Sequence, residues 1–194
     1  SPQQIDQAQS ALARYCSESV ILSTCNRIEV YAVTQGADTV ARDVALTLAE
    51  IHALPLEVFA PHLYCLKGME AVGHLFTVAA GLDSLILGEP QILGQVRDAY
   101  EAAAARRVAG PILCRMFRHA VKVGKKVRSD TAISRHAVSV SYAAVELARK
   151  IFGSLAGRKV LIIGAGKMGE LAARTLLDNG LAGVVVTNRT HARA

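Results

Sequence analysis

The sequence predicts an α/β protein in two parts, and three observations lead to that class. Short β-branched runs indicate strands at 20–22 and 28–33, and again at 159–163 and 184–186. Between these runs, apolar residues recur at helical spacing. A glycine-rich segment directly follows the third strand. We therefore expect an α+β first domain with a mixed sheet, followed by a doubly wound second domain.

The predicted boundary lies between residues 131 and 132, giving domains 1–131 and 132–194. Within them, a short apolar pattern predicts one further strand at 63–65. Apolar residues at steps of three and four predict the helices. Their expected ranges are 2–15, 38–52, 69–80, 91–107, 112–128 and 142–152.

Composition favours a soluble globular protein with a sizeable core. Of the 194 residues, 52% are hydrophobic, which is enough to bury a core. No apolar run reaches the roughly 18 residues of a membrane helix. The 4 cysteines show no CxxC spacing, so we expect neither a disulfide framework nor a metal site. This cysteine usage indicates a reducing compartment.

A polar block, Ser23-Thr24-Cys25-Asn26-Arg27-Ile28-Glu29, separates the first two predicted strands and places a thiol at a strand end. A cysteine is more often a small buried hydrophobe than a nucleophile, but these polar neighbours favour a reactive thiol. The Arg27 guanidinium favours the thiolate, while Thr24 and Asn26 offer hydrogen bonds. The other cysteines, which we expect to be structural, are Cys16, Cys65 and Cys114.

A second polar segment covers residues 81–96, where glycines and a proline interrupt the helical pattern. Its carboxylates, hydroxyl and amides are too numerous for a core segment. They suit the wall of a pocket that forms hydrogen bonds with an amino acid. The candidates in this segment are Asp83, Ser84, Glu89 and Gln91.

The glycine-rich segment reads as a dinucleotide-binding loop because a strand precedes it and a helix follows it. Its residues are Gly164, Ala165, Gly166, Lys167, Met168 and Gly169. The first glycine would make the turn, the second would let a pyrophosphate approach the backbone, and the third would let helix pack on strand. The phosphates would lie at the helix N-terminus.

The strand after this loop ends in Asn188-Arg189-Thr190. An NAD-binding protein usually has a carboxylate at this position, where it binds the ribose hydroxyls. An amide and a guanidinium instead favour a 2′-phosphate, so the sequence predicts NADPH as the cofactor.

Basic residues are concentrated between positions 106 and 135, where Asp130 is the only acid, and the formal net charge of the chain is +6. Such a run is usually a solvated helix face. It would also attract a polyanion such as tRNA, with salt-sensitive binding. Charge alone leaves both interpretations open. The residues concerned are Arg106, Arg107, Arg115, Arg118, Lys122, Lys125, Lys126, Arg128 and Arg135.

The Ser23–Glu29 block resembles the catalytic-cysteine motif of the glutamyl-tRNA reductase family. Residues 81–96 resemble that family's longest signature, in the expected order and spacing, and the similarity extends from about residue 20 to residue 189. The resemblance implies an NADPH-dependent oxidoreductase that reduces glutamyl-tRNA(Glu) to glutamate-1-semialdehyde. That reaction is the first step of five-carbon tetrapyrrole (haem and chlorophyll) biosynthesis.

The same resemblance implies a role for each candidate residue. The Cys25 thiolate would attack the glutamyl ester, and NADPH would reduce the resulting thioester. A helical histidine is more often structural, but the resemblance gives His74 a role in proton management or carbonyl polarisation. Arg27 would bind the glutamyl side-chain carboxylate as a bidentate fork. The remaining implied substrate-binding residues are Thr24, Asn26, Ser84, Glu89 and Gln91.

The resemblance also implies a homodimer in the full-length protein, channelling of the product to the semialdehyde aminotransferase, and no membrane association. The implied compartment is the bacterial cytoplasm or the plastid stroma, and the basic stretch would contribute to tRNA binding. Because the family's first strand and its later nucleotide-domain strands have no counterpart here, we expect a fragment that binds NADPH weakly or not at all and is itself inactive.

Two alternatives stay open. An NADP-dependent dehydrogenase of a small metabolite would explain the glycine-rich loop but not the two polar segments, and insensitivity to thiol alkylation would favour it. A non-catalytic tRNA-binding or regulatory fragment would explain the basic stretch. Salt-dependent tRNA binding without thioester formation would favour that second alternative.

Overall fold

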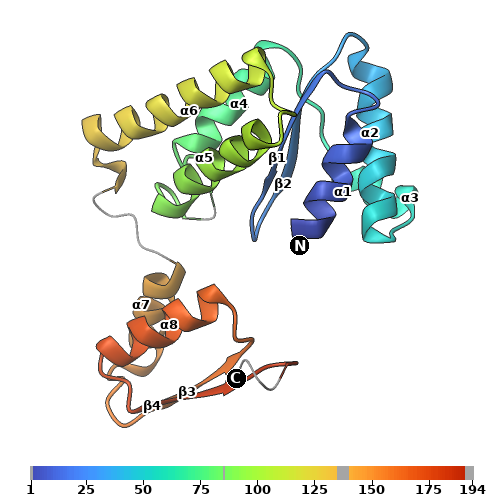
Figure 1. The fold of residues 1–194 in the computed structure, drawn as a ribbon. Helices are drawn as coiled ribbons and strands as arrows, with labels where there is room; N and C mark the ends of the chain where they lie inside the picture. The colour runs from blue at the N-terminus through green and yellow to red at the C-terminus, as the bar shows by residue number, and fades with distance from the viewer. Residues whose placement is uncertain (1, 85, 135–139, 191–194) are drawn as a thin grey trace. The chain divides into compact units, whose positions relative to one another are not determined.

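A computed structural model describes residues 2–84, 86–134 and 140–190 of the chain. They belong to two compact units, 1–135 and 136–194 (Figure 1). Helices and strands occur in both units, which confirms the predicted α/β class.

The first unit combines one β-hairpin with helices. Its elements in chain order are α1 (Pro2–Leu12), β1 (Glu18–Ser23), β2 (Ile28–Val33), α2 (Ala37–His52), α3 (Leu56–Phe59), η1 (Ala60–His62), α4 (Met69–Ala79), α5 (Pro90–Ala105), α6 (Pro111–Asp130) and η2 (Ala132–Ser134).

The hairpin forms the middle layer of this unit. Strands β1 and β2 pair antiparallel, from Glu18 opposite Val33 to Ser23 opposite Ile28. Among the described residues of the unit they make a two-stranded sheet. Helices α1 and α2 cover one face, while α4, α5 and α6 cover the other (Figure 1).

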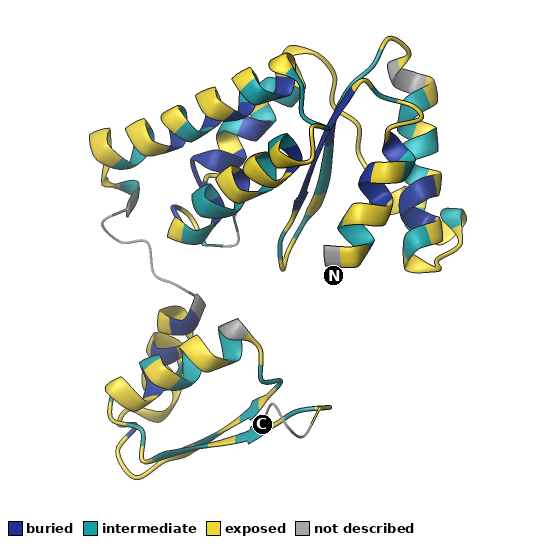
Figure 2. Ribbon diagram, viewed as in Figure 1, coloured by how far each residue is buried: buried dark blue, intermediate teal, exposed yellow. Residues whose placement is uncertain are grey.

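The sequence produces these layers because strand side chains alternate between faces. Val20, Leu22 and Tyr31 point into the main core with α4, α5 and α6. Ile21 and Val30 point the other way, against α1 and α2. Figure 2 shows β1 as a buried strand between these helix layers.

A buried carboxylate fixes the start of α6 against the hairpin. Glu18 is only 6% exposed. It accepts the backbone N–H groups of Ile112 at 3.1 Å and Leu113 at 2.7 Å. These are unpaired donors of the first helical turn, where a negative charge is favourable. A Cβ at Gly110 would lie 2.5 Å from the Glu18 carboxyl group, so this approach requires glycine.

Residues 63–65 do not form the predicted strand, and that expectation was wrong. The segment is irregular and exposed between η1 and α4. An apolar pattern makes a strand only where a partner strand and a core face are available. Here Tyr64 instead turns its hydroxyl toward side chains of β2 and α4.

The second unit is a βαβ arrangement preceded by a helix. Its elements are α7 (Val140–Phe152), β3 (Lys159–Ile163), α8 (Lys167–Asp178) and β4 (Gly183–Thr187). Strands β3 and β4 pair parallel, from Lys159 opposite Gly183 to Ile163 opposite Thr187. Parallel strands joined by a helix are the building block of doubly wound nucleotide-binding folds. The small core centres on Val145, Leu155 and Leu176.

Within the described residues, no single helix is both long and apolar enough to cross a membrane. One bent pair of helices, Thr39–His52 with Leu56–His62, meets the length and composition requirement jointly.

Candidate active site

Cys25 lies at the tip of the turn between β1 and β2, and it is exposed. The turn is held by Thr24, whose Oγ1 accepts the N–H groups of Asn26 at 3.2 Å and Arg27 at 3.1 Å. The Thr24 N–H donates to the Arg27 carbonyl at 2.9 Å. The thiol is therefore mounted on an ordered backbone and remains accessible to a substrate.

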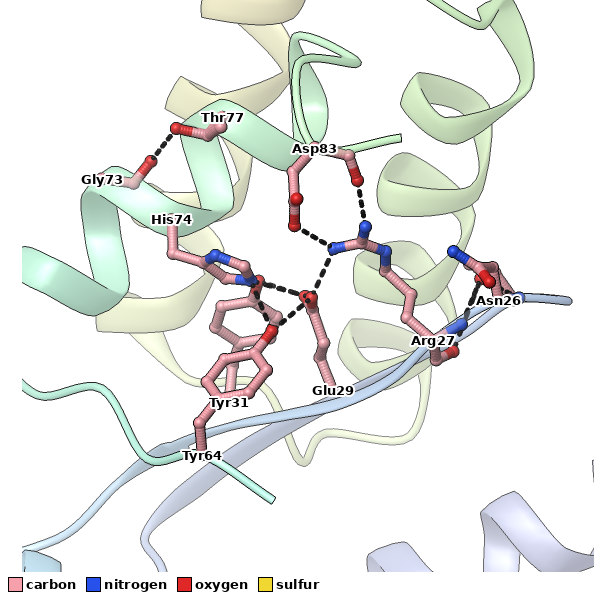
Figure 3. Close-up of polar contacts among 10 residues, drawn as sticks. Asn26, Arg27, Glu29, Tyr31, Tyr64, Gly73, His74, Thr77 and Asp83 are labelled. Atoms are coloured by element: carbon pink, nitrogen blue, oxygen red, sulfur yellow. Dashed lines mark hydrogen bonds and ion pairs between the residues drawn. The ribbon is translucent and has the colours of Figure 1, made fainter. Parts of the chain in front are cut away.

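Beside the turn, Glu29 joins β2 to α4 through its carboxylate (Figure 3). Its Oε1 accepts from Arg27 Nη1 at 2.9 Å and faces His74 Nε2 at 2.8 Å. Its Oε2 accepts the Tyr31 hydroxyl at 2.6 Å, and the Tyr64 hydroxyl lies 3.5 Å from Oε1. We call these five residues the Glu29 cluster.

The cluster stabilises the ionised form of Glu29. Burial opposes ionisation, but hydrogen bonds from Tyr31, His74 and Arg27 outweigh it and hold the pKa of Glu29 below its usual value. Burial, followed by the hydrogen bond to this carboxylate, raises the pKa of Tyr31. Burial, followed by the nearby Glu29 charge, raises the pKa of Tyr64. Both phenols therefore stay protonated as donors.

The carboxylate also sets the orientation of the His74 ring. Because Glu29 can only accept, Nε2 of His74 carries the proton in this contact. Nδ1, the other ring nitrogen, has no hydrogen-bond partner among the described residues. The Tyr64 ring packs edge-on against the imidazole, with centroids 5.6 Å apart. On the other side of α4, Leu75, Val78 and Ala79 are buried and fix the helix.

Arg27 reaches a second carboxylate, on the segment that follows α4. Its Nη1 lies 2.8 Å from Asp83 Oδ2, and its Nη2 donates to the Asp83 carbonyl. The hydrogen bond from Arg27 lowers the pKa of Asp83. The Asp83 side chain is 51% exposed, whereas that of Glu29 is 9% exposed. A substrate carboxylate could thus replace Asp83 on the guanidinium more easily than Glu29.

The segment after α4 closes into a loop at two glycines. The N–H of Gly88 donates to the Gly81 carbonyl at 2.9 Å. Both residues have positive φ, +74° for Gly81 and +75° for Gly88, a conformation that favours glycine. Arg128 of α6 donates to the carbonyls of Gly88 and Glu89. We call residues 81–89 the clamped loop; Leu85 within it lies outside the described residues.

The predicted substrate-binding residues of this region are half-buried. The side chains of Ser84, Glu89 and Gln91 have no hydrogen-bond partner among the described residues. No hydrogen bond there joins them to Cys25 or His74. The structure thus links Arg27 to His74 through Glu29, and Arg27 also contacts Asp83, the chain neighbour of Ser84.

In the second unit, the glycine-rich loop leads from β3 into α8. Gly164 has φ +108°, and its N–H donates to the Thr187 carbonyl at 2.7 Å. Gly166 is the N-cap of α8, and a Cβ there would meet no atom within 4 Å. A Cβ at Gly169 would lie 2.6 Å from the Gly164 carbonyl oxygen and 3.2 Å from Ile162 Cγ2. The close helix–strand packing therefore depends on that glycine.

The end of β4 lies beside this loop. Asn188 Oδ1 accepts the Ala165 N–H at 3.4 Å, and Asn188 Nδ2 donates to the Thr190 carbonyl at 2.9 Å. Arg189 is exposed and has no ion-pair partner within the described part of the unit. Lys167 and Met168 open α8, with the Lys167 side chain outside the described residues. Open backbone and an unpaired guanidinium fit a phosphorylated dinucleotide.

Three residues of the first site had no predicted site role, namely Glu29, Tyr31 and Tyr64. The sequence did carry a signal for Glu29 and Tyr31. They follow Arg27 at steps of two residues, and alternate residues of a strand lie on the same face. No local pattern pointed to Tyr64, which reaches the cluster from the irregular segment before α4. Within the described residues, no group of three or more side chains is placed to hold a metal ion.

Fold and site together define a class, an α/β protein in which a thiol-bearing unit precedes a dinucleotide-binding unit. Residues 1–131 match the family model of the glutamyl-tRNAGlu reductase N-terminal domain, and residues 146–194 match that of shikimate / quinate 5-dehydrogenase. The chain belongs to the glutamyl-tRNA reductase family. The two matches together imply a nicotinamide cofactor.

Relatives and a solved structure agree with this membership. The chain is 56% identical over 178 residues to the glutamyl-tRNA reductase of Syntrophotalea carbinolica, covering 92% of this chain and 40% of that protein. It is 52% identical over 193 residues to that of Geobacillus thermodenitrificans, covering 98% and 42%. The glutamyl-tRNA reductase structure from Methanopyrus kandleri matches with TM-score 0.58 and 39% identity, covering 99% and 47%. The chain thus spans about two fifths of the length of these curated relatives.

Proposed function

We propose that this protein serves the NADPH-dependent reduction of glutamyl-tRNA(Glu) to glutamate-1-semialdehyde, the first step of tetrapyrrole biosynthesis. Residues 1–131 would bind glutamyl-tRNA and accept its glutamyl group on Cys25. Residues 132–194 would contribute to NADPH binding. One observation carries the proposal: the exposed Cys25 thiol is mounted on an ordered turn whose other end, Arg27, belongs to the Glu29 cluster.

In the first step, the Cys25 thiolate attacks the carbonyl carbon of the glutamyl ester. A sulfur–carbon bond forms, the ester carbon–oxygen bond breaks, and the tRNA 3′ hydroxyl leaves after taking a proton. His74 suits the proton transfer because Glu29 fixes its ring and leaves Nδ1 unpartnered among the described residues. A protonated Nδ1 would also polarise the ester carbonyl.

The glutamyl group is assigned to the side chains around Arg27. The guanidinium would receive the substrate carboxylate in place of the half-exposed Asp83. Ser84, Glu89 and Gln91, which have no partner among the described residues, would bind the α-ammonium and carbonyl groups. Thr24 and Asn26 keep the turn in shape through the Thr24 Oγ1 contacts.

The second unit is suited to hold the cofactor through its backbone. The N-terminus of α8 would receive the pyrophosphate at Gly164, Gly166 and Gly169. Arg189, with Asn188 and Thr190 beside it, would bind the 2′-phosphate, which favours NADPH over NADH. NADPH bound there would supply the hydride that reduces the thioester.

Bacterial relatives favour the bacterial cytoplasm over the plastid stroma as the compartment. A homodimer and product transfer to the semialdehyde aminotransferase belong to the same proposal for the full-length protein. A dehydrogenase of a small metabolite is not favoured, because it does not explain why residues 1–131 match the glutamyl-tRNAGlu reductase N-terminal domain.

The test is acylation without NADPH. The chain is mixed with tRNA carrying labelled glutamate, and protein-bound label that hydroxylamine releases is measured. We expect label on the unmodified chain, none on Cys25→Ala, and full label on Cys65→Ala, which removes the other exposed cysteine. Equal label on the Cys25→Ala and unmodified chains would contradict the assigned nucleophile.

A further inference from the structure

The basic residues between 106 and 135 differ in what surrounds them. Some are already engaged: Arg106 pairs with Asp6 and Lys126 with Asp130. Arg128 donates to carbonyls of the clamped loop. Arg135 lies outside the described residues.

Four basic residues of α6 remain without an ion-pair partner among the described residues. They are Arg115, Arg118, Lys122 and Lys125, which we call the α6 ridge. They are spaced by three, four and three residues, so they lie on one face of the helix over roughly 15 Å. All four are exposed. His119 is exposed beside them and adds no negative charge.

The ridge stands on a rigid support. The opposite face of α6 buries Leu113, Phe117, Ala120 and Gly124 in the main core. A Cβ at Gly124 would lie 2.5 Å from the Ala79 carbonyl, so α6 packs closely on α4. The outer side of the helix is exposed along its length (Figure 2). The four cations are therefore presented to solvent in a fixed row.

The neighbouring helix α5 shows what an ordinary solvated face of this unit looks like. There Arg97 pairs with Asp98 at 2.8 Å and approaches Glu101 at 3.9 Å. Charges of both signs neutralise one another on α5. On α6, like charges at helical spacing repel and lower helix stability. A row of unneutralised cations is more consistent with an external polyanion than with solvation alone.

The chemistry of the ridge favours nucleic acid over a lipid surface. An interfacial helix interleaves cations with large apolar groups that enter the bilayer. Between Arg115 and Lys125, the exposed positions of α6 carry only basic side chains and His119. Ile112, three residues before Arg115, is the one large apolar side chain of α6 that is exposed. Regularly spaced cations with so little exposed apolar surface suit successive phosphates of a nucleic-acid backbone.

We propose that the α6 ridge binds the phosphate backbone of the tRNA body. This inference rests on the proposed function, which supplies tRNA as the substrate. The same helix donates from Arg128 to the clamped loop, one turn beyond Lys125. A tRNA held along the ridge is thus anchored to the element that fixes the loop next to Arg27.

The test compares two triple variants with equal loss of charge. Arg115→Gln/Lys122→Gln/Lys125→Gln removes three of the four ridge cations. The control, Arg14→Gln/Arg42→Gln/Arg97→Gln, removes exposed cations directly after α1, on α2 and on α5 in the same unit. Affinity for unacylated tRNA is measured over a series of salt concentrations, and circular dichroism confirms that both variants fold.

We expect the ridge variant to bind tRNA at least about tenfold more weakly, and the slope of log affinity against log salt to fall by about 1 for each phosphate-binding cation removed. The control should keep the affinity and slope of the unmodified chain. Unchanged affinity and slope in the ridge variant would overturn the proposal. Equal losses of tRNA affinity in both variants would also overturn it. So would a ridge variant that binds anionic lipid vesicles more weakly than the unmodified chain but binds tRNA equally well.

A second arm separates this inference from the proposed function. A glutamylated trinucleotide representing the tRNA 3′ end carries the reactive ester without the tRNA body. The ridge variant should form the Cys25 thioester from it at the rate of the unmodified chain, and more slowly only from subsaturating glutamyl-tRNA. If neither the unmodified chain nor the ridge variant forms a thioester from either substrate, the proposed function fails. The dependence of tRNA affinity on salt concentration tests the α6 ridge independently of that outcome.

Discussion

The two candidate sites are built from different parts of the chain. In the first unit, side chains of β2 and α4 meet, and the contact of Glu29 with His74 joins residues 45 positions apart. In the second unit, the loop from Gly164 to Gly169 is continuous in sequence, and it offers its own backbone groups, to the Thr187 carbonyl and to the Asn188 side chain. The first site should therefore fail when the central Glu29 side chain is removed. The second should fail when a side chain is added to one of its glycines.

The largest effect is expected when Glu29 is replaced. Glu29→Ala leaves Arg27 and His74 without their shared carboxylate in a largely buried place. We expect the free energy of unfolding to fall by about 2–4 kcal/mol, and thioester formation to slow by about a hundredfold. Urea denaturation and the labelling assay measure the two effects. Glu57→Ala, which removes an exposed carboxylate of α3, is the control; equal behaviour of the two variants would deny Glu29 its role.

A pair of glycine variants sharpens the backbone side of the comparison. Gly169→Ala places a Cβ 2.6 Å from the Gly164 carbonyl oxygen. It should destabilise the second unit by about 1–3 kcal/mol and weaken NADPH binding with it. Gly166→Ala meets open space, so it should leave thermal unfolding unchanged while weakening NADPH binding about tenfold. If both variants melted alike, close packing at Gly169 would not be what its glycine provides.

A smaller effect tests cofactor choice. Arg189→Gln removes the exposed guanidinium after β4, and the ratio of NADPH to NADH affinity should fall about tenfold, the size of one charge-assisted hydrogen bond. Fluorescence titration with each nucleotide measures the ratio. Arg174→Gln removes a cation of α8 that pairs with Glu170 and serves as the control. A ratio unchanged by Arg189→Gln would assign the 2′-phosphate elsewhere.

The smallest effect is a pH dependence of stability. The pKa of Glu29 in the folded protein lies below its ordinary value of 4.5. Its contribution is therefore fully present above that value and is lost as pH falls through the lower folded pKa. The loss should be smaller than that caused by Glu29→Ala, because protonation keeps the side chain in place. Urea denaturation at descending pH should show a shallower acid loss for Glu29→Gln than for the unmodified chain, and equal slopes would contradict this.

What the sequence could predict follows from the same contrast. The dinucleotide loop is local, and a motif framed by strand and helix specifies its backbone geometry. The Cys25 turn is local too, because Thr24 forms hydrogen bonds only with its near neighbours. Asp83 contacts Arg27, and Tyr64 contacts Glu29, each from a distant segment of the chain. No periodicity in the sequence encodes such contacts. The prediction that Arg27 binds substrate stays a prediction, since here its partners are Glu29 and Asp83.

The helices and paired strands were predictable for a similar reason, because apolar spacing reports which face is buried. The expected strand at 63–65 failed because its apolar residues are exposed and have no pairing partner among the described residues. The basic stretch shows a further limit. Charge counts could not distinguish Arg128, which donates to carbonyls of the clamped loop, from the exposed cations of the α6 ridge.

The buried contact of Glu18 bears on the order of folding. The hairpin closes through a short turn, whereas Glu18 meets the start of α6 across 94 and 95 residues of chain. Closing so long a loop costs entropy before the contact can form. We expect the hairpin to precede α6 docking. Glu18→Gln should then accelerate unfolding and leave the rate of refolding nearly unchanged.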